Sequence, residues 1–237
     1  MMKNSVTCPE CKTENPYYNS VCSNCRSFLK DRVYNLDLWS LIGSLIESPS
    51  KAFRQIIFAE HKNFVFFILI FVTLKYLINI RFIAMVSVGD FQLSVGLQLS
   101  YLLVLGITLG FFLLFSYMYN VIGGRNKIYL RFKDTFAILV YSQIPLVFAL
   151  IILFTLELVI LGDYLFSLNP SPLIVKGLIA YLFLALEFGT VIWSFFLSFK
   201  AFRAQSQSLS FSLVALISFV ILLSFLLYVC SLFVFTI

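Results

Sequence analysis

Four of the five cysteines form two pairs near the N-terminus, and their spacing is typical of a metal site. Cys8-Pro-Glu-Cys11 and Cys22-Ser-Asn-Cys25 are Cys-x-x-Cys motifs separated by ten residues. Each pair can place two thiolates on one ion, and a hairpin between the pairs would close a tetrahedral site of four cysteine ligands. Because four protein ligands leave no position for water, the spacing predicts structural Zn²⁺. Two redox motifs are the less favoured alternative, because a thioredoxin-type site needs one such motif on a βαβ scaffold.

Four ionisable side chains lie inside long apolar segments, namely Lys75, Arg81, Glu157 and Glu187. Burying such a group in hydrocarbon costs at least about 2.5 kcal/mol, so each should face other helices, a water-filled cavity or lipid headgroups. At about 1.5 Å per residue, Lys75 and Glu187 lie about 16 and 18 Å from the ends predicted to be cytoplasmic. Arg81 and Glu157 lie at about 26 and 32 Å. The depths predict two ion pairs, Lys75 with Glu187 and Arg81 with Glu157, which either fix helix contacts or belong to an ion or proton pathway.

Sequence signatures of catalysis are absent. The chain has no H-E-x-x-H, no G-x-S-x-G and no glycine-rich phosphate loop. Its one histidine, His61, borders the first apolar segment, where an interfacial role is expected. We therefore expect a protein that is not an enzyme.

The composition indicates a polar head and a lipid-soluble body. Of 237 residues, 61% are hydrophobic and 12% charged, against about half and a quarter in a soluble domain. Fourteen of the charged side chains lie in residues 1–63, as many as in the rest of the chain. This balance argues against a secreted protein, a cytosolic enzyme and a disordered chain.

Five apolar segments are long enough to cross about 30 Å of hydrocarbon as helices. Membrane β-strands would show alternating polarity, which these segments lack. No apolar stretch precedes Phe64, so no cleavable secretory signal is expected. The sequence thus predicts an all-α polytopic membrane protein with spans at 64–85, 93–122, 136–161, 173–199 and 209–237.

The distribution of Lys and Arg predicts the orientation. Eight lie in the head. The others that decide the orientation lie in two loops: the first contains Arg125, Lys127, Arg131 and Lys133, and the second contains Lys200 and Arg203. These regions should be cytoplasmic, with Ile237 outside the cell and the spans in the plasma membrane. The net charge of +6 then reflects topology and attraction to anionic lipids, and no nucleic-acid partner is expected.

Between the cysteines and the first span, residues 31–63 contain two amphipathic helical patterns. Leu38, Leu41 and Leu45 recur at helical spacing, and Ser48-Pro49 then predicts an N-cap and first-turn proline for a second helix that presents Phe53. Helices of this kind commonly lie in the membrane interface. Packing against the cytoplasmic ends of the bundle is an equal alternative.

Two local features concern helix geometry within the spans. Pro145 removes an internal hydrogen bond and should kink the third span. Gly106 and Gly110 form a GxxxG motif, which lets helices approach closely and leaves a homo-oligomer open.

The segment CPECKTENPYYNSVCSNC resembles the zinc-ribbon heads of many bacterial membrane proteins, with Lys12 and Arg26 where glycine often follows each cysteine pair. Tyr17, Tyr18 and Phe28 are the expected core of this ribbon, residues 1–30. Such a small core implies dependence on metal for folding.

Residues 36–237 resemble the Yip-domain family, five-span proteins named for interaction with Ypt and Rab GTPases in eukaryotes and also found in bacteria. Three short motifs carry the resemblance: Pro49 with Phe53 before the first span, Gly123-Gly124 at the basic loop, and Tyr141-Ser142 with Pro145 at the third span. The resemblance implies membrane organisation or protein binding without a known reaction. The ribbon points to a bacterial member, for which binding of Rab GTPases is not expected.

Two functions are compatible with these features. The first is a membrane scaffold or adaptor, in which the lipid-embedded domain (64–237) carries a zinc ribbon that contacts a protein partner. The alternative is a transporter or channel subunit that uses the intramembrane charges. Five spans cannot divide into the equal halves common among transporters, which favours the first.

Overall fold

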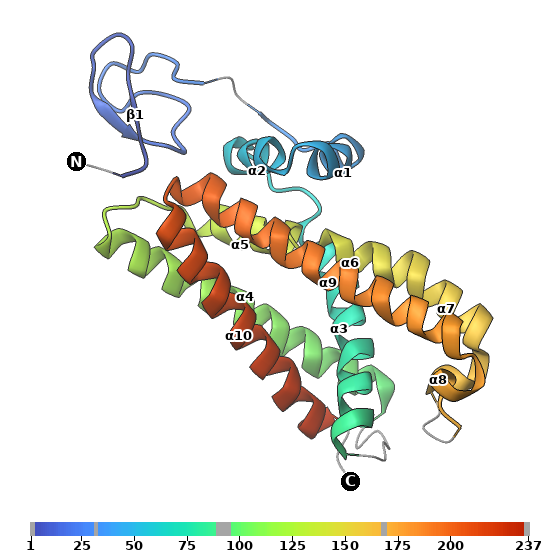
Figure 1. The fold of residues 1–237 in the computed structure, drawn as a ribbon. Coiled ribbons are helices and arrows are strands. Elements are labelled where there is room, and N and C mark those ends of the chain that lie inside the picture. The colour runs from blue at the N-terminus through green and yellow to red at the C-terminus, as the bar shows by residue number, and fades with distance from the viewer. Residues whose placement is uncertain (1–2, 31–32, 89–95, 167–169, 235–237) are drawn as a thin grey trace. The chain divides into compact units, whose positions relative to one another are not determined.

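The computed structural model is almost entirely helical and describes residues 3–30, 33–88, 96–166 and 170–234 (Figure 1). Two short strands, β1 (Ser5–Thr7) and β2 (Glu14–Pro16), pair antiparallel with Val6 opposite Asn15. The helices follow as α1 (Leu38–Glu47), α2 (Pro49–Phe58), α3 (Val65–Val88), α4 (Leu97–Arg125), α5 (Phe132–Tyr141), α6 (Ile144–Phe148), α7 (Phe154–Leu161), α8 (Pro172–Val175), α9 (Gly177–Ser206) and α10 (Leu209–Val234).

Five helical segments are long and apolar enough to cross a membrane, which confirms the predicted fold class. They are Val65–Ala84, Leu97–Arg125, Phe132–Leu165, Gly177–Ser206 and Leu209–Val234. Residues 93–95 and 235–237 of the predicted second and fifth spans lie outside the described residues.

The fourth span extends well beyond its predicted end at residue 199. Helix α9 continues through Lys200 and Arg203 to Ser206, because both are good helix formers whose apolar stems tolerate the interface. Gln207, with a φ of 56°, adopts the left-handed conformation that ends many helices.

The third span is interrupted just before Pro145, where the sequence predicts a kink. Helix α5 ends at Tyr141, and α6 begins at Ile144 with Pro145 in its first turn. A π-helical turn (Ala149–Leu153) then joins α6 to α7. The proline prediction identified the position of the break, whereas the π-turn has no counterpart in the sequence prediction.

The chain groups into two compact units. Unit 1 contains Met1–Val65, Phe111–Ser142 and Phe196–Phe219, and unit 2 contains Phe66–Gly110, Gln143–Phe195 and Val220–Ile237. The ribbon (1–30) and the amphipathic helices (31–63) thus group with parts of α4, α5, α9 and α10.

Each unit has its own apolar core. In unit 1, Phe115 and Tyr119 of α4 contact Phe202 of α9, with ring centroids 6.0 and 5.1 Å apart, and Phe115 also meets Phe219 of α10 at 5.2 Å. Such offset and edge contacts stabilise beyond simple burial. In unit 2, a buried cluster joins Leu161, Leu165, Ala180 and Phe183.

Candidate functional site

The four N-terminal cysteines converge on one point. All four Sγ atoms lie within 4.8 Å of one another, and the pairs Cys8 with Cys25 and Cys11 with Cys22 are each 3.5 Å apart. Four sulfurs around Zn²⁺ at Zn–S distances of about 2.3 Å are separated by about 3.8 Å. The cluster therefore fits a metal ion with tetrahedral coordination by four sulfurs.

The backbone around the two cysteine pairs repeats with an offset of 14 residues. Cys8 N donates to Thr13 O at 3.0 Å as Cys22 N donates to Ser27 O at 2.9 Å. Lys12 and Arg26 both have a φ of 59°, so the left-handed turns form although neither residue is glycine. Such a conformation costs roughly 1–2 kcal/mol for a non-glycine residue, which metal binding can offset.

Hydrogen bonds favour the thiolate form of two cysteines. Bonds to the Thr13 hydroxyl and backbone lower the pKa of Cys11 to about 5, and bonds from the Cys11 amide and the Ser27 hydroxyl lower the pKa of Cys8. Thiolates are the form that binds zinc. A bound ion would be held by Cys8, Cys11, Cys22 and Cys25, and a closed set of four ligands supplies rigidity rather than catalysis.

Asn15 links the two cysteine pairs. Its Nδ2 donates to Thr13 O at 2.9 Å and to Cys22 Sγ at 3.4 Å, and its Oδ1 accepts from Ser23 N and Ser23 Oγ, both at 2.9 Å. The side chain is fully buried. Asn15 thus orients a ligand through the kind of outer contact that supports metal sites. In the sequence, Asn15 belongs to the Glu-Asn-Pro segment after the first cysteine pair, and nothing there indicated this role.

The ribbon is attached to the loop between α4 and α5 within unit 1. The side chain of buried Asn4 pairs with the backbone of Tyr129 through two 2.8 Å hydrogen bonds, and Lys3 N donates to Lys127 O at 3.0 Å. No sequence motif pointed to Asn4. The ribbon therefore binds the same basic loop whose Lys and Arg residues predict the topology.

Lys30 forms a second attachment, between the ribbon and α2. Its Nζ lies 3.6 Å from the ring centroid of Tyr17 and 4.1 Å from that of Phe58, and it donates to the Tyr17 carbonyl at 2.8 Å. The expected aromatic core is only partly realised, because Phe28 is 69% exposed.

A buried carboxylate joins α2 to the start of α5. Asp134 is fully buried and accepts from Arg131 Nε at 2.7 Å, while Lys62 Nζ lies 3.1 Å from its other oxygen. Lys62 also donates to the Ile57 and Ala59 carbonyls, so its charge complements the C-terminus of α2. Burial lowers the pKa of Lys62, and Asp134 opposes that shift. Sequence reasoning assigned Lys62 no partner and missed Asp134.

The first family-like motif, Pro49 with Phe53, lies in unit 1 and has a local structural role. Pro49 begins α2, and Phe53 is fully buried; Ser48 stands at the N-cap position, without a capping bond from its hydroxyl. Helix α2 packs on α5. This contact favours packing against the ends of the helical bundle over a position in the membrane interface.

Gly123-Gly124 ends α4 in a Schellman motif. Ile128 N donates to Gly123 O at 2.9 Å and Lys127 N donates to Gly124 O at 3.1 Å, with Lys127 at a φ of 60°. A Cβ added to Gly123 would lie 2.5 Å from a Leu130 methyl carbon, whereas one on Gly124 would meet nothing within 4 Å. Only the first glycine is therefore required by packing.

The third motif terminates α5. The Tyr141 hydroxyl donates to the Asn63 carbonyl, and Ser142 Oγ donates to Leu139 O at 2.7 Å and accepts from Ser198 Oγ at 3.0 Å. These contacts lie within unit 1. They attach α5 to the segment before α3 and to α9, just before the break at Pro145.

In unit 2 the structure brings Lys75 and Glu187 together. Lys75 Nζ lies 2.6 Å from Glu187 Oε1, and the lysine is fully buried. Among the described residues no ion pair joins Arg81 to Glu157. Glu157, 4% exposed, instead interacts electrostatically with Glu187 and Lys75. The predicted depths of about 16 Å for Lys75 and about 32 Å for Glu157 do not anticipate this neighbour.

The comparison with known proteins agrees with this arrangement. A family model described as the Yip1 domain matches residues 42–233, a range that includes all three family-like motifs. No curated protein and no solved structure matches the chain. The match covers well over half of the 237 residues, and this chain belongs to the Yip1 domain family.

Proposed function

We propose that this chain is a non-enzymatic membrane scaffold or adaptor whose cytoplasmic zinc ribbon contacts a protein partner. The observation that supports this most is the attachment of the ribbon to unit 1 through Asn4 and Tyr129. A ribbon fixed to the loop between α4 and α5 can present a defined surface, whereas one on a free tether could not.

Exposed apolar side chains of the head support the same proposal. Phe28 of the ribbon is 69% exposed, and Trp39 and Ile46, seven residues apart on α1, are 78% and 59% exposed. Residues seven apart share a helix face. Contiguous apolar surface outside lipid commonly marks protein contact sites, and Trp39 and Ile46 form such a stripe on one face of α1.

The proposed topology places the ribbon inside the cell and Ile237 outside, in the plasma membrane, as the Lys and Arg distribution predicts. A homo-oligomer is compatible with Gly106 and Gly110, since a Cβ at either would meet nothing within 4 Å. Thiol labelling of intact cells tests the topology. A reporter cysteine at the C-terminus should be labelled from outside, and one at the N-terminus should not.

Co-purification tests the adaptor role. The full chain is extracted in detergent, and zinc per chain and associated proteins are measured for wild type, Cys22→Ser with Cys25→Ser, and the control Cys230→Ser. We expect one zinc per chain and a defined partner, both lost only in the double variant. Phe28→Ser with Trp39→Ser should retain zinc and lose the partner. A set of associated proteins that is the same in all variants would contradict the proposal.

Transport is the second candidate, because the Lys75–Glu187 pair places charge inside the spans next to a cavity. Flux in proteoliposomes separates the two functions. A transporter would retain flux after the double cysteine change and lose it with Glu187→Gln, whereas a scaffold would show no flux in any variant.

A further inference from the structure

We propose that unit 2 contains a binding site for a monovalent lipophilic organic cation, in an intramembrane cavity lined by Glu187 and by four aromatic side chains. This inference goes beyond the scaffold role and does not depend on the ribbon. It rests on the size of the cavity, its walls, and the charges around it.

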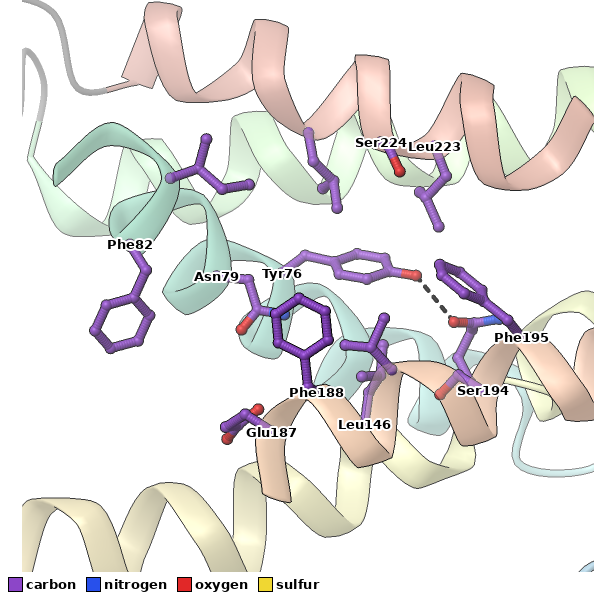
Figure 2. Close-up of a pocket in the computed structure, with 14 residues that line it drawn as sticks. Tyr76, Asn79, Phe82, Leu146, Glu187, Phe188, Ser194, Phe195, Leu223 and Ser224 are labelled. Atoms are coloured by element: carbon purple, nitrogen blue, oxygen red, sulfur yellow. Dashed lines mark hydrogen bonds between the residues drawn. The ribbon is translucent and has the colours of Figure 1, made fainter. Parts of the chain in front are cut away.

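The cavity has a volume of about 330 Å³ and is lined by residues of α3, α6, α9 and α10 that all belong to unit 2 (Figure 2). That is more than twice the roughly 150 Å³ of an apolar cavity that stays dry and binds benzene. It also reaches the range of roughly 300–1,000 Å³ found for small-molecule sites. The cavity is therefore large enough for an organic ligand.

Four aromatic rings line the cavity, those of Tyr76, Phe82, Phe188 and Phe195. Figure 2 shows the ring of Phe188 beside Asn79 and Tyr76, with Glu187 at the edge of the group. The faces of such rings attract cations, most strongly when water is excluded. The walls thus suit a ligand that is both apolar and positively charged.

The charges beside the cavity are unbalanced. Glu187 lines it, whereas Lys75, its partner at 2.6 Å, is fully buried and does not. Glu157 interacts electrostatically with both, so two acidic side chains neighbour one ammonium group and, when both are ionised, carry one uncompensated negative charge. Arg81, the other base of α3, does not line the cavity. In hydrocarbon such a charge is balanced by a proton or by a cation, and the cavity gives a cation access to Glu187.

The Asn79 amide is a polar group of the cavity without a hydrogen-bond partner among the described residues. Tyr76, in contrast, donates to Gln143 Oε1 at 3.1 Å. The Asn79 carbonyl oxygen can accept a hydrogen bond from an ammonium group or solvate a quaternary cation.

Equilibrium binding of radiolabelled tetraphenylphosphonium to the purified full chain tests the proposal, with triphenylphosphine oxide as the neutral analogue. We expect saturable binding of one cation per chain, weakened at least tenfold by Glu187→Gln. Competition by the neutral compound should be at least tenfold weaker than by unlabelled cation. Gel filtration and zinc content show whether each variant is folded.

If Glu187→Gln does not fold, a matched pair of substitutions on α9 still tests the site. Val191→Phe fills the cavity and should abolish binding, whereas Ile192→Phe, at a neighbouring position that is 62% exposed, should leave it unchanged. Cys22→Ser with Cys25→Ser should also leave binding unchanged, which separates this site from the adaptor role. Absence of saturable binding, equal affinity for the neutral compound, or equal effects of the two α9 variants would overturn the proposal.

Discussion

The side-chain amide of Asn4 pairs with the backbone of Tyr129, which lies 125 residues further along the chain. Its Nδ2 donates to the Tyr129 carbonyl and its Oδ1 accepts from the Tyr129 amide, each at 2.8 Å, and the asparagine is 2% exposed. The two bonds imitate one step of a β-ladder. They make a single side chain a specific link between the ribbon and the loop that follows α4.

Asn4→Ala should loosen the ribbon. The change leaves the Tyr129 amide and carbonyl without their partner, at a cost of about 1–3 kcal/mol for each group that water does not reach. Hydrogen exchange of β1 and of residues 126–131 should accelerate together, while zinc content stays the same. Asn35→Ala, at an exposed position, is the control. Unchanged exchange in the loop would show that the link contributes nothing to attachment.

The convergence of the four cysteines could be predicted from the sequence, whereas the roles of Asn4 and Asn15 could not. Cysteine is rare and its spacing specifies a local hairpin, so the ligand set is contained in 18 consecutive residues. The asparagines are common residues, and the partner of Asn4 lies far along the chain. Only a folded arrangement, or a set of related sequences, could distinguish them from surface asparagines.

Asp134→Asn should destabilise unit 1 by about 3 kcal/mol. Asp134 is the carboxylate between Lys62 and Arg131, and removing one partner leaves buried charge uncompensated. Chemical unfolding followed by exchange of α2 and α5 measures the effect.

Glu47→Gln, at an exposed carboxylate, serves as the control for Asp134→Asn. Lys62→Gln should cost less than Asp134→Asn, because Arg131 still compensates the carboxylate. A larger loss in Lys62→Gln than in Asp134→Asn would contradict this order.

The two glycines after residue 122 should respond in opposite directions to alanine. Gly123→Ala places a methyl group 2.5 Å from a Leu130 side-chain carbon and 3.2 Å from the Ile128 carbonyl oxygen. The Leu130 side chain and the Ile128 carbonyl must then move, at a cost of roughly 1–3 kcal/mol that exceeds the gain in helix propensity. Gly124→Ala meets no neighbour and should stabilise α4 by about 0.5–1 kcal/mol. Melting temperatures of the two variants make the comparison, and equal shifts would refute the packing argument.

Lys30 should lose its proton at unusually low pH. Burial, followed by the charge of Arg54, lowers the pKa of Lys30 to about 8, against about 10.4 in an unfolded chain. Between these values the unfolded chain binds more protons, so the free energy of unfolding rises with pH. NMR of labelled lysine side chains gives the pKa directly, and Lys30→Met should remove this part of the pH dependence. An ordinary pKa for Lys30 would contradict the prediction.

Composition and helical period predict spans well but predict helix ends and breaks poorly. Apolar residues 136–161 read as one continuous segment because hydropathy does not register backbone geometry. The structure divides the segment at Ser142-Gln143 and again by a π-turn. The Pro145 ring accounts for the break at Ser142-Gln143. No residue in Ala149–Leu153 predicts the π-turn. Charge pairing has the same limit, since the predicted depths matched Glu157 with Arg81, whereas its charged neighbours are Glu187 and Lys75.

Lys75 and Glu187 should behave as a coupled pair in stability. Lys75→Met and Glu187→Met each leave one charge in the apolar interior and should each destabilise unit 2, whereas the double change removes both charges and should do no further harm. Unfolding in mixed micelles, followed through exchange of α3 and α9, measures the cycle. Because Glu157 also interacts with Lys75, Glu187→Met should be milder than Lys75→Met, which leaves two carboxylates without a base. Strictly additive losses in the double variant would show that the 2.6 Å contact contributes no coupling energy.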